Sequence, residues 1–189
     1  CNADAGTLYL KSGDQLDFKI VLNSSLNLEI RHLDKETSKF PPIILFDDET
    51  QEYNFKNVAS VTAIKKEMIH IEDAYENTEF DFSGTKIFDQ KNNYRSKSFL
   101  TIPLLNYHGE VTGVLQLINC IHPKHNKVVP FTDIMRKGVQ SLSSLAATAI
   151  ENQMLLEAEK ELLNSFIKLI SGAIDKKSPY TGGHCSRVP

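Results

Sequence analysis

Two groups of side chains have the residue types that could bind a metal ion. Cys120, His122 and His125 offer a thiolate and two imidazoles within one loop, which are ligands that suit zinc or another soft metal. Their spacing matches no standard site, and the run HPKH is typical of an exposed turn, so we interpret this segment as a surface loop. The acidic run at 47–49 (DDE) offers carboxylates for a divalent cation, but a solvated loop is again the preferred interpretation.

The three cysteines of the chain are few and far apart. Cys1, Cys120 and Cys185 are odd in number, and no two of them have zinc-finger spacing. This usage indicates a reducing compartment and argues against a framework of disulfides, because disulfides persist in oxidising environments. We therefore expect a cytoplasmic protein.

The charge and hydropathy of the chain exclude two broad classes of partner. The formal net charge is -3 and the basic residues are scattered, so the dense basic stripe that nucleic-acid binding needs is missing. No apolar run approaches the roughly 20 residues that cross a bilayer. We expect no nucleic-acid partner and no membrane contact within this segment.

Two pairs of β-rich runs predict hairpins. Residues 6–10 and 16–22 are joined by a polar turn containing glycine, and residues 98–105 and 111–119 are joined in the same way. Gly113 within the last run marks a bulge or a close backbone approach. Strands that come in hairpins favour an α+β fold with a central antiparallel sheet flanked by helices.

Further elements are predicted between the two hairpins. Residues 57–66 form a short helix capped by Asn57, and residues 69–71 form a short strand. The polar segment 76–97 carries scattered aromatic residues. We expect short helices and loops there that lie over the sheet.

A long helix is predicted from Asp133 to about Asp175, after a cap at Thr132. It contains no proline and would measure about 65 Å at 1.5 Å per residue, too long to pack on one small domain. A heptad assignment gives an apolar a column and a d column with two polar residues, which supports a homodimeric parallel coiled coil with a fixed register. The a positions are Leu142, Ala149, Leu156, Leu163 and Ile170, and the d positions are Leu145, Asn152, Glu159, Phe166 and Ala173. The alternative is a helix that packs on its own sheet first and on a following domain later.

Several motifs resemble those of bacterial GAF domains. The opening run NADAGTLYL, the run IHIEDAY, and the hairpin SFLTIPLLNYHGEVTGVLQLIN followed by a long helix are similar to that family. The resemblance covers residues 1–152 and lacks the helix that normally precedes the first strand. It implies a GAF fold with a long C-terminal signalling helix, arranged as a sensor domain at 1–132 and a linker helix at 133–175.

The tail of the chain is similar to another family. The run AIDKKSPYTGGHCSRVP resembles the opening of HD-type and HD-GYP phosphohydrolases, so we expect residues 176–189 to be the start of such a domain. The resemblance implies that His184, in the GH-x-x-RV motif, is a metal ligand in the longer parent protein. Tyr180 stands where some members place a carboxylate ligand, which favours a two-metal site in the parent. A two-metal phosphodiesterase needs several further ligands, so we expect this fragment to bind no metal cofactor and to be inactive, whereas the parent would cleave cyclic-di-GMP or a related nucleotide.

The resemblance also implies where a small-molecule ligand would bind. The pocket of GAF domains lies between the sheet and the helices that connect its middle strands, which maps here to residues 72–97 and the strands near Leu100 and Gln116. Apolar walls would come from Phe80, Phe82 and Phe88. The polar residues expected to converge on the ligand are Asp73, Tyr75, Thr85, Tyr94, Ser98, Thr101 and Gln116.

Two known classes of GAF ligand fit this sequence poorly. GAF domains that bind cyclic nucleotides carry an NKFDE motif, but here Asn119 is followed by Cys120, and Phe131 is followed at the required positions by Met135 and Arg136. Bilin-binding members attach the pigment through a cysteine near the pocket lid, and no cysteine lies between Cys1 and Cys120.

Three functions remain open at this point. The first is a regulatory domain that senses an unknown small molecule and controls its own C-terminal HD domain. The second is a dimerisation module with an empty pocket. The third is a GAF-fold enzyme such as a free methionine sulfoxide reductase, which requires a reactive thiol and a resolving partner.

Overall fold

A computed structural model describes residues 2–31, 40–47 and 50–177. The strands in chain order are β1 (Ala3–Ser12), β2 (Gln15–Asn23), β3 (Leu28–Arg31), β4 (Ile43–Ile44), β5 (Phe46–Asp47), β6 (Glu52–Tyr53), β7 (Ile69–Ile71), β8 (Phe99–Leu105), β9 (Val111–Ile121) and β10 (Val128–Val129). The helices are α1 (Val58–Lys65), α2 (Ser83–Asn92) and α3 (Asp133–Lys177). His184, Asp48 and Glu49 lie outside the described residues.

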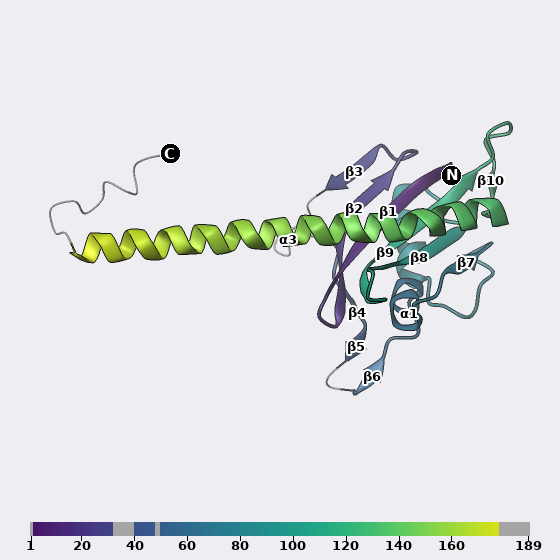
Figure 1. Cartoon of the computed structure of the whole chain (residues 1–189). Helices are drawn as coiled ribbons and strands as arrows, with labels where there is room; N and C mark the ends of the chain where they lie inside the picture. The colour runs from purple at the N-terminus through teal and green to yellow at the C-terminus, as the bar shows by residue number, and fades with distance from the viewer. Residues whose placement is uncertain (1, 32–39, 48–49, 178–189) are drawn as a thin grey trace. The chain divides into compact units, whose positions relative to one another are not determined.

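The main sheet has the order β3-β2-β1-β9-β8-β7, with β4 beside β2 and β10 beside β9, and every pairing is antiparallel (Figure 1). Both predicted hairpins are confirmed, as β1–β2 and β8–β9. Gly13 closes the first with a φ of 60°, which glycine adopts without steric cost. The α+β class with a central antiparallel sheet is therefore confirmed.

Helix α1 begins where the sequence predicts. The Asn57 side chain accepts hydrogen bonds from the backbone N–H groups of Ala59 (2.8 Å) and Ser60 (3.4 Å), which satisfies two donors that a helix start leaves open. The helix ends at Lys66, whose φ of 57° is left-handed. The predicted strand at 69–71 is confirmed as β7, and the predicted helix within 76–97 is α2.

The two faces of the main sheet are covered differently. On one face Ala59 and Ala63 of α1 pack against Tyr9 and Val114, and the neighbouring cluster joins Phe99 to other buried residues. On the opposite face Leu100 and Ile102 form a cluster with Cys120 and Phe131, against which Met135 and Val139 of α3 pack. Adjacent residues of β8, such as Phe99 and Leu100, thus face opposite sides, as the period of a strand requires.

Gly113 marks a place where two strands come unusually close. A Cβ atom added to it would lie 2.3 Å from the carbonyl oxygen of Tyr9 on β1, a separation that real Cβ atoms do not reach. The predicted close backbone approach is therefore confirmed. A register shift also occurs in the β8–β9 pairing, between Leu104 and Leu105.

The chain divides into two compact units, Cys1–Thr148 and Ala149–Pro189. Helix α3 is continuous across this division and confirms the predicted long helix, whereas the domain limits 1–132, 133–175 and 176–189 stay predictions. Within the first unit α3 lies over the sheet, where Ser143 and Ala147 are buried (Figure 1). Of the helices the structure describes, none has both the length and the apolar composition to cross a bilayer.

Candidate functional site

A cavity of about 560 Å³ lies on the α1 face of the main sheet. Its volume falls in the range of small-molecule sites. Strands β1, β2 and β9 form its base, helix α2 contributes one wall, and the segment 40–44 contributes another. The side chains that matter most below are Thr7, Tyr9, Phe18, Asn23, Phe40, Asp81, Phe82, Thr85, Phe88, Tyr94, Phe99 and Gln116.

The structure brings together part of the predicted ligand site. Phe82, Thr85, Phe88, Tyr94 and Gln116 line this cavity, and they come from α2, from the residues just before and after it, and from β9. Whether they bind a ligand stays a prediction.

The other five predicted residues do not line this cavity. Phe80 packs against the neighbouring cluster that contains Phe99. Ser98 is buried, donates to the carbonyl oxygen of Val129 (3.0 Å) and accepts from the backbone N–H of Cys120 (3.2 Å). Thr101 of β8 is fully buried and pairs with Gln116 of β9. Asp73 and Tyr75 belong to a polar network described below.

The polar groups at the base of the cavity bond to one another. The Tyr9 hydroxyl donates to Oε1 of Gln116 (3.3 Å), and Nε2 of Gln116 donates to the Thr101 hydroxyl (3.2 Å). Burial raises the pKa of Tyr9 far above its ordinary value, so its hydroxyl stays protonated. These side chains at the base of the cavity therefore carry no charge at neutral pH. The base of the cavity is therefore neutral, and its polar side chains form hydrogen bonds with one another.

Aromatic side chains that the sequence analysis missed form one wall. The rings of Tyr9 and Phe18 lie 4.7 Å apart between centroids, and Phe18 stacks on Phe40 at 5.1 Å with an interplanar angle of 26°. The sequence analysis missed them because it did not predict that β1 pairs with β9. This pairing puts Tyr9 beside Val114 and Thr7 beside Gln116. Hairpin patterns reveal neighbours along the chain but not this long-range pairing.

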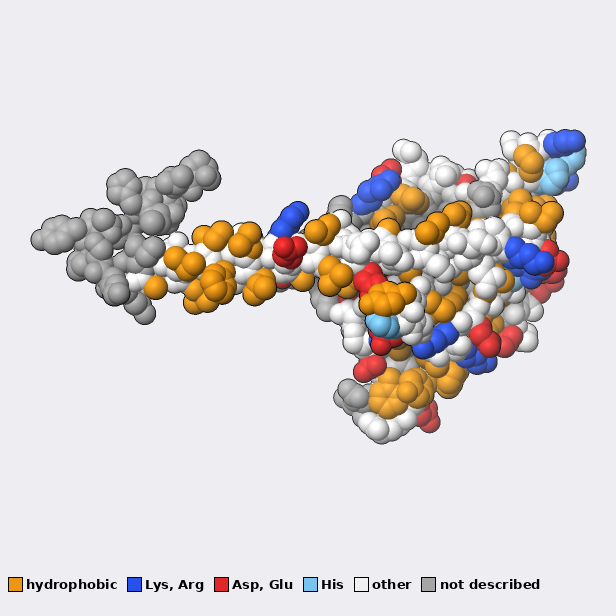
Figure 2. Space-filling model, viewed as in Figure 1, with side chains coloured by type: hydrophobic (Ala, Val, Ile, Leu, Met, Phe, Trp, Pro, Cys, Tyr) orange, Lys and Arg blue, Asp and Glu red, His pale blue; other side chains and the backbone are white. Residues whose placement is uncertain are grey.

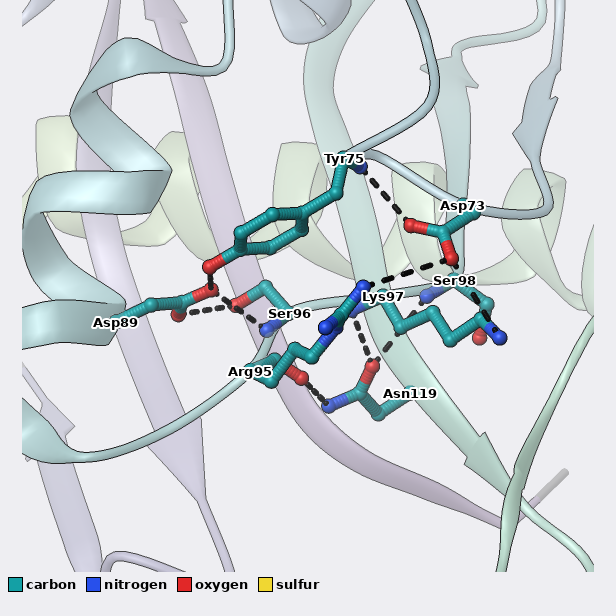
Figure 3. A network of polar contacts seen from close by, with 8 residues as sticks. All are labelled: Asp73, Tyr75, Asp89, Arg95, Ser96, Lys97, Ser98 and Asn119. Carbon is teal, nitrogen blue, oxygen red and sulfur yellow. Dashed lines mark hydrogen bonds and ion pairs between the residues drawn. The ribbon is translucent and has the colours of Figure 1, made fainter.

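A polar network holds the α2 wall in place (Figure 3). The buried Asp89 carboxylate, near the end of α2, accepts hydrogen bonds from the Tyr75 hydroxyl (2.8 Å), the Ser96 backbone N–H (2.7 Å) and the Ser96 hydroxyl (2.8 Å). Burial and the Asp89 carboxylate raise the pKa of Tyr75, so its hydroxyl remains a donor. The Arg95 guanidinium lies 4.5 Å from the centroid of the Tyr75 ring, in cation–π geometry.

Asn119 joins the same network to strand β9. Its Oδ1 accepts from the backbone N–H groups of Lys97 (2.7 Å) and Ser98 (3.3 Å), and its Nδ2 donates to the Tyr94 hydroxyl (2.9 Å) and the Arg95 carbonyl (2.8 Å). The φ of Asn119 is 57°, a left-handed conformation that asparagine tolerates better than most residues. This side chain therefore fixes the segment that leads from α2 into β8.

Asp73 faces a second, more polar depression of about 410 Å³, lined by His70, Glu72, Asp73, Glu76, Asn77 and Lys97. The Asp73 carboxylate accepts from the Tyr75 backbone N–H (2.9 Å) and lies 3.5 Å from Nζ of Lys97. Because the cavity of about 560 Å³ is larger and has a more apolar and aromatic lining, we take it as the ligand-site candidate.

The sequence-derived metal candidates are arranged as follows. Cys120 is buried with its sulfur 3.6 Å from that of Met135, while the rings of His122 and His125 stack 4.9 Å apart. In the described part of the chain no three His, Cys, Asp or Glu side chains are grouped to hold a metal ion. Burial also raises the pKa of the Cys120 thiol, the opposite of what a reactive thiol needs.

Replacing Asp89 with asparagine should lower the free energy of unfolding by about 2 kcal/mol, because an amide nitrogen would then face donors that now bond to a carboxylate. Urea titration followed by far-ultraviolet circular dichroism measures this change. The exposed carboxylate Glu79 provides the control, since its replacement with glutamine should leave the midpoint unchanged. Equal midpoints for both variants would contradict the role assigned to Asp89.

Comparison with known proteins gives one family. The sequence profile of the GAF domain matches residues 1–150. The cGMP-specific 3',5'-cyclic phosphodiesterase of Drosophila virilis is 30% identical over 100 residues, which is 53% of this chain and 10% of that protein. The same enzyme of Drosophila melanogaster is 29% identical over 100 residues, or 53% and 8%. The chain thus spans about a tenth or less of these relatives.

Solved structures share the fold. The GAF domain of a phosphoenolpyruvate-protein phosphotransferase from Coxiella burnetii has a TM-score of 0.56 at 14% identity, covering 82% of this chain and 76% of that one. The GAF domain of a two-component sensor histidine kinase from Bacillus halodurans has a TM-score of 0.52 at 16% identity, covering 83% and 87%. At these identities the likeness establishes the fold alone.

Proposed function

Since the chain belongs to the GAF domain family, we propose that it is a regulatory domain that senses a small molecule and controls a C-terminal HD-type metal-dependent phosphohydrolase. The cavity of about 560 Å³ supports the sensing part. The tail resembling an HD opening supports the output part, together with similarity to relatives named as cyclic phosphodiesterases.

One observation carries the link between ligand and output. On strand β9 Gln116 lines the cavity, while the next residue, Leu117, packs in the cluster beneath α3 on the opposite face. A ligand that shifts β9 therefore acts directly on the surface that supports the helix. Such a ligand regulates only if it binds two states of the domain with different affinity.

The proposed output route is α3, acting as a parallel homodimer. We call the residues at the a and d positions of the heptads the seam residues. In the first unit the helix buries Ala147 against the domain, whereas the seam residues Leu142 and Leu145 are exposed. In the second unit the hydrophobic side chains along the helix are exposed as well (Figure 2). The seam residues that are at least half exposed are Leu142, Leu145, Leu156, Leu163, Phe166 and Ile170.

The catalytic step would take place in the HD domain of the longer protein. His184 is the one expected metal ligand in this chain and lies outside the described residues. Two divalent ions would need further His and carboxylate ligands from the rest of the parent, which would cleave cyclic-di-GMP or a related nucleotide. The chain itself would be a cytoplasmic sensor without catalysis.

The second candidate is a dimerisation module whose cavity stays empty. The exposed apolar side chains of α3 favour it, because they favour association whether or not a ligand binds.

A variant with a filled cavity separates the two candidates. Thr85→Trp places a large ring at the cavity wall, and Ile87→Trp places the same ring on the exposed face of α2. Nucleotides and small metabolites are screened by thermal shift on the wild type and by phosphodiester hydrolysis of the longer protein. A sensor should give ligands that raise Tm and change the hydrolysis rate in the wild type and in Ile87→Trp, but not in Thr85→Trp. If no ligand raises the Tm of the wild type and none changes the rate of hydrolysis, the second candidate, a dimerisation module with an empty cavity, is correct.

A further inference from the structure

The lining of the cavity is poor in charge. Among the described residues that line it there is no Lys, Arg or His, and the one acidic side chain is Asp81 at the exposed rim. The Ser83 backbone N–H donates to Asp81 (2.8 Å) and lowers the pKa of that carboxyl, so it stays ionised at neutral pH. Lys56 and Lys86 are close enough to lower this pKa further, but neither lines the cavity.

The strongest hydrogen-bonding groups inside the cavity already have partners. The Tyr9 hydroxyl donates to Gln116, and Gln116 donates to Thr101, which does not itself line the cavity. The Tyr94 hydroxyl donates to Oδ2 of Asp4 (2.6 Å) and accepts from Nδ2 of Asn119 (2.9 Å). An anion entering the cavity would therefore lose its hydration without meeting a cationic side chain among the described lining residues, which is costly.

The walls suit flat rings. Tyr9, Phe18 and Phe40 form a contiguous aromatic wall, and Phe82 lies 5.2 Å from Phe99 between ring centroids. Aromatic side chains favour other rings in offset or edge-to-face geometry. Phe88 of α2 adds a further aromatic side chain to the lining.

We propose that the cavity binds an uncharged, ring-containing ligand and discriminates against phosphorylated ones. This inference rests on the proposed sensing function of the same cavity. It separates this domain from a sensor of cyclic nucleotides, because a cyclic phosphate would be placed beside neutral and aromatic side chains and near the carboxylate of Asp81.

Two fluorescent probes that share one skeleton test the charge preference. N-phenyl-1-naphthylamine is neutral, and 8-anilino-1-naphthalenesulfonate carries an added sulfonate. Each is titrated into the whole chain, and the part of the signal lost in Thr85→Trp but kept in Ile87→Trp is assigned to the cavity. The neutral probe should bind the cavity at least about tenfold more tightly, a difference of about 1.4 kcal/mol.

Adding a cation should weaken the preference for the neutral probe. Thr85→Lys puts an ammonium group at the cavity wall and should narrow the ratio of the two Kd values by about fivefold or more, whereas Ile87→Lys should leave it unchanged. Guanosine and 3',5'-cyclic GMP, used as competitors, should show the same order, with guanosine displacing the neutral probe at lower concentration.

The outcomes distinguish the two proposals. Equal or tighter cavity binding of the sulfonate, or stronger competition by cyclic GMP, overturns the charge preference and leaves the sensing function standing. If neither probe gives a signal that Thr85→Trp removes, the cavity does not bind small molecules and both proposals fail together.

Discussion

Replacing Gly113 with valine should lower the free energy of unfolding by at least about 3 kcal/mol. The added side chain would begin 2.3 Å from the Tyr9 carbonyl oxygen, which is backbone and cannot rotate away. Strands β1 and β9 would have to separate where Leu10 pairs with Gly113, in the middle of the sheet. The loss is a large fraction of the stability of an ordinary domain.

Urea titration followed by far-ultraviolet circular dichroism measures this loss. Gly6→Ala is the matched control, since Gly6 lies on β1 and its added Cβ would meet Leu117 at an ordinary 3.4 Å. Gly138→Ala, in α3 with open space around it, should be stabilising by up to about 1 kcal/mol. A Gly113→Val protein as stable as Gly6→Ala would show that the two strands do not approach as closely as described.

Introducing Leu156→Asp and Leu163→Asp together should convert a dimer into a monomer. Both residues occupy a positions and are more than half exposed, so a partner helix would bury them and an introduced carboxylate would have to be desolvated in the seam. In sedimentation velocity the wild type should behave as about twice its 21.3 kDa chain mass, and the variant as a single chain.

The control carries the same charges on the far side of the helix. Ala158 and Ser165 fall at c positions of the same heptads and are exposed, so Ala158→Asp with Ser165→Asp should leave the dimer intact. A monomeric wild type at high concentration would refute the dimer, and dissociation by the control pair would refute the assigned seam.

The sequence predicted those parts of the fold that depend on local pattern. The alternation in 6–10 and 16–22 identified the first hairpin, Asn57 identified the start of α1, and the proline-free run after Thr132 identified α3. Long-range pairing is not encoded in such patterns, so the β1–β9 contact and the part of the cavity's base formed by β1 and β2 were missed.

The residues predicted for the ligand site were also identified only in part. Thr85, Phe88 and Gln116 were named because the resemblance to GAF domains maps the pocket to residues 72–97 and to the strands near Leu100 and Gln116, and all three line the cavity. Thr101 was placed at the ligand although its hydroxyl accepts from Gln116 and it has no exposed surface. Alternation also fails at Asn119, where the left-handed backbone brings Cys120 to the same side as Leu117. A sequence pattern carries no sign of that reversal.

Of the residues that the structure describes, none both lines the cavity and belongs to the cluster beneath α3. If the cavity binds a ligand as proposed, the side chains that contact the ligand are therefore different from those that hold α3 on the sheet. Substitutions in the lining would then change which ligand binds without altering the contacts between α3 and the sheet. Under the proposed function, the same helix α3 would then transmit the binding of a different small molecule without any change to its own sequence.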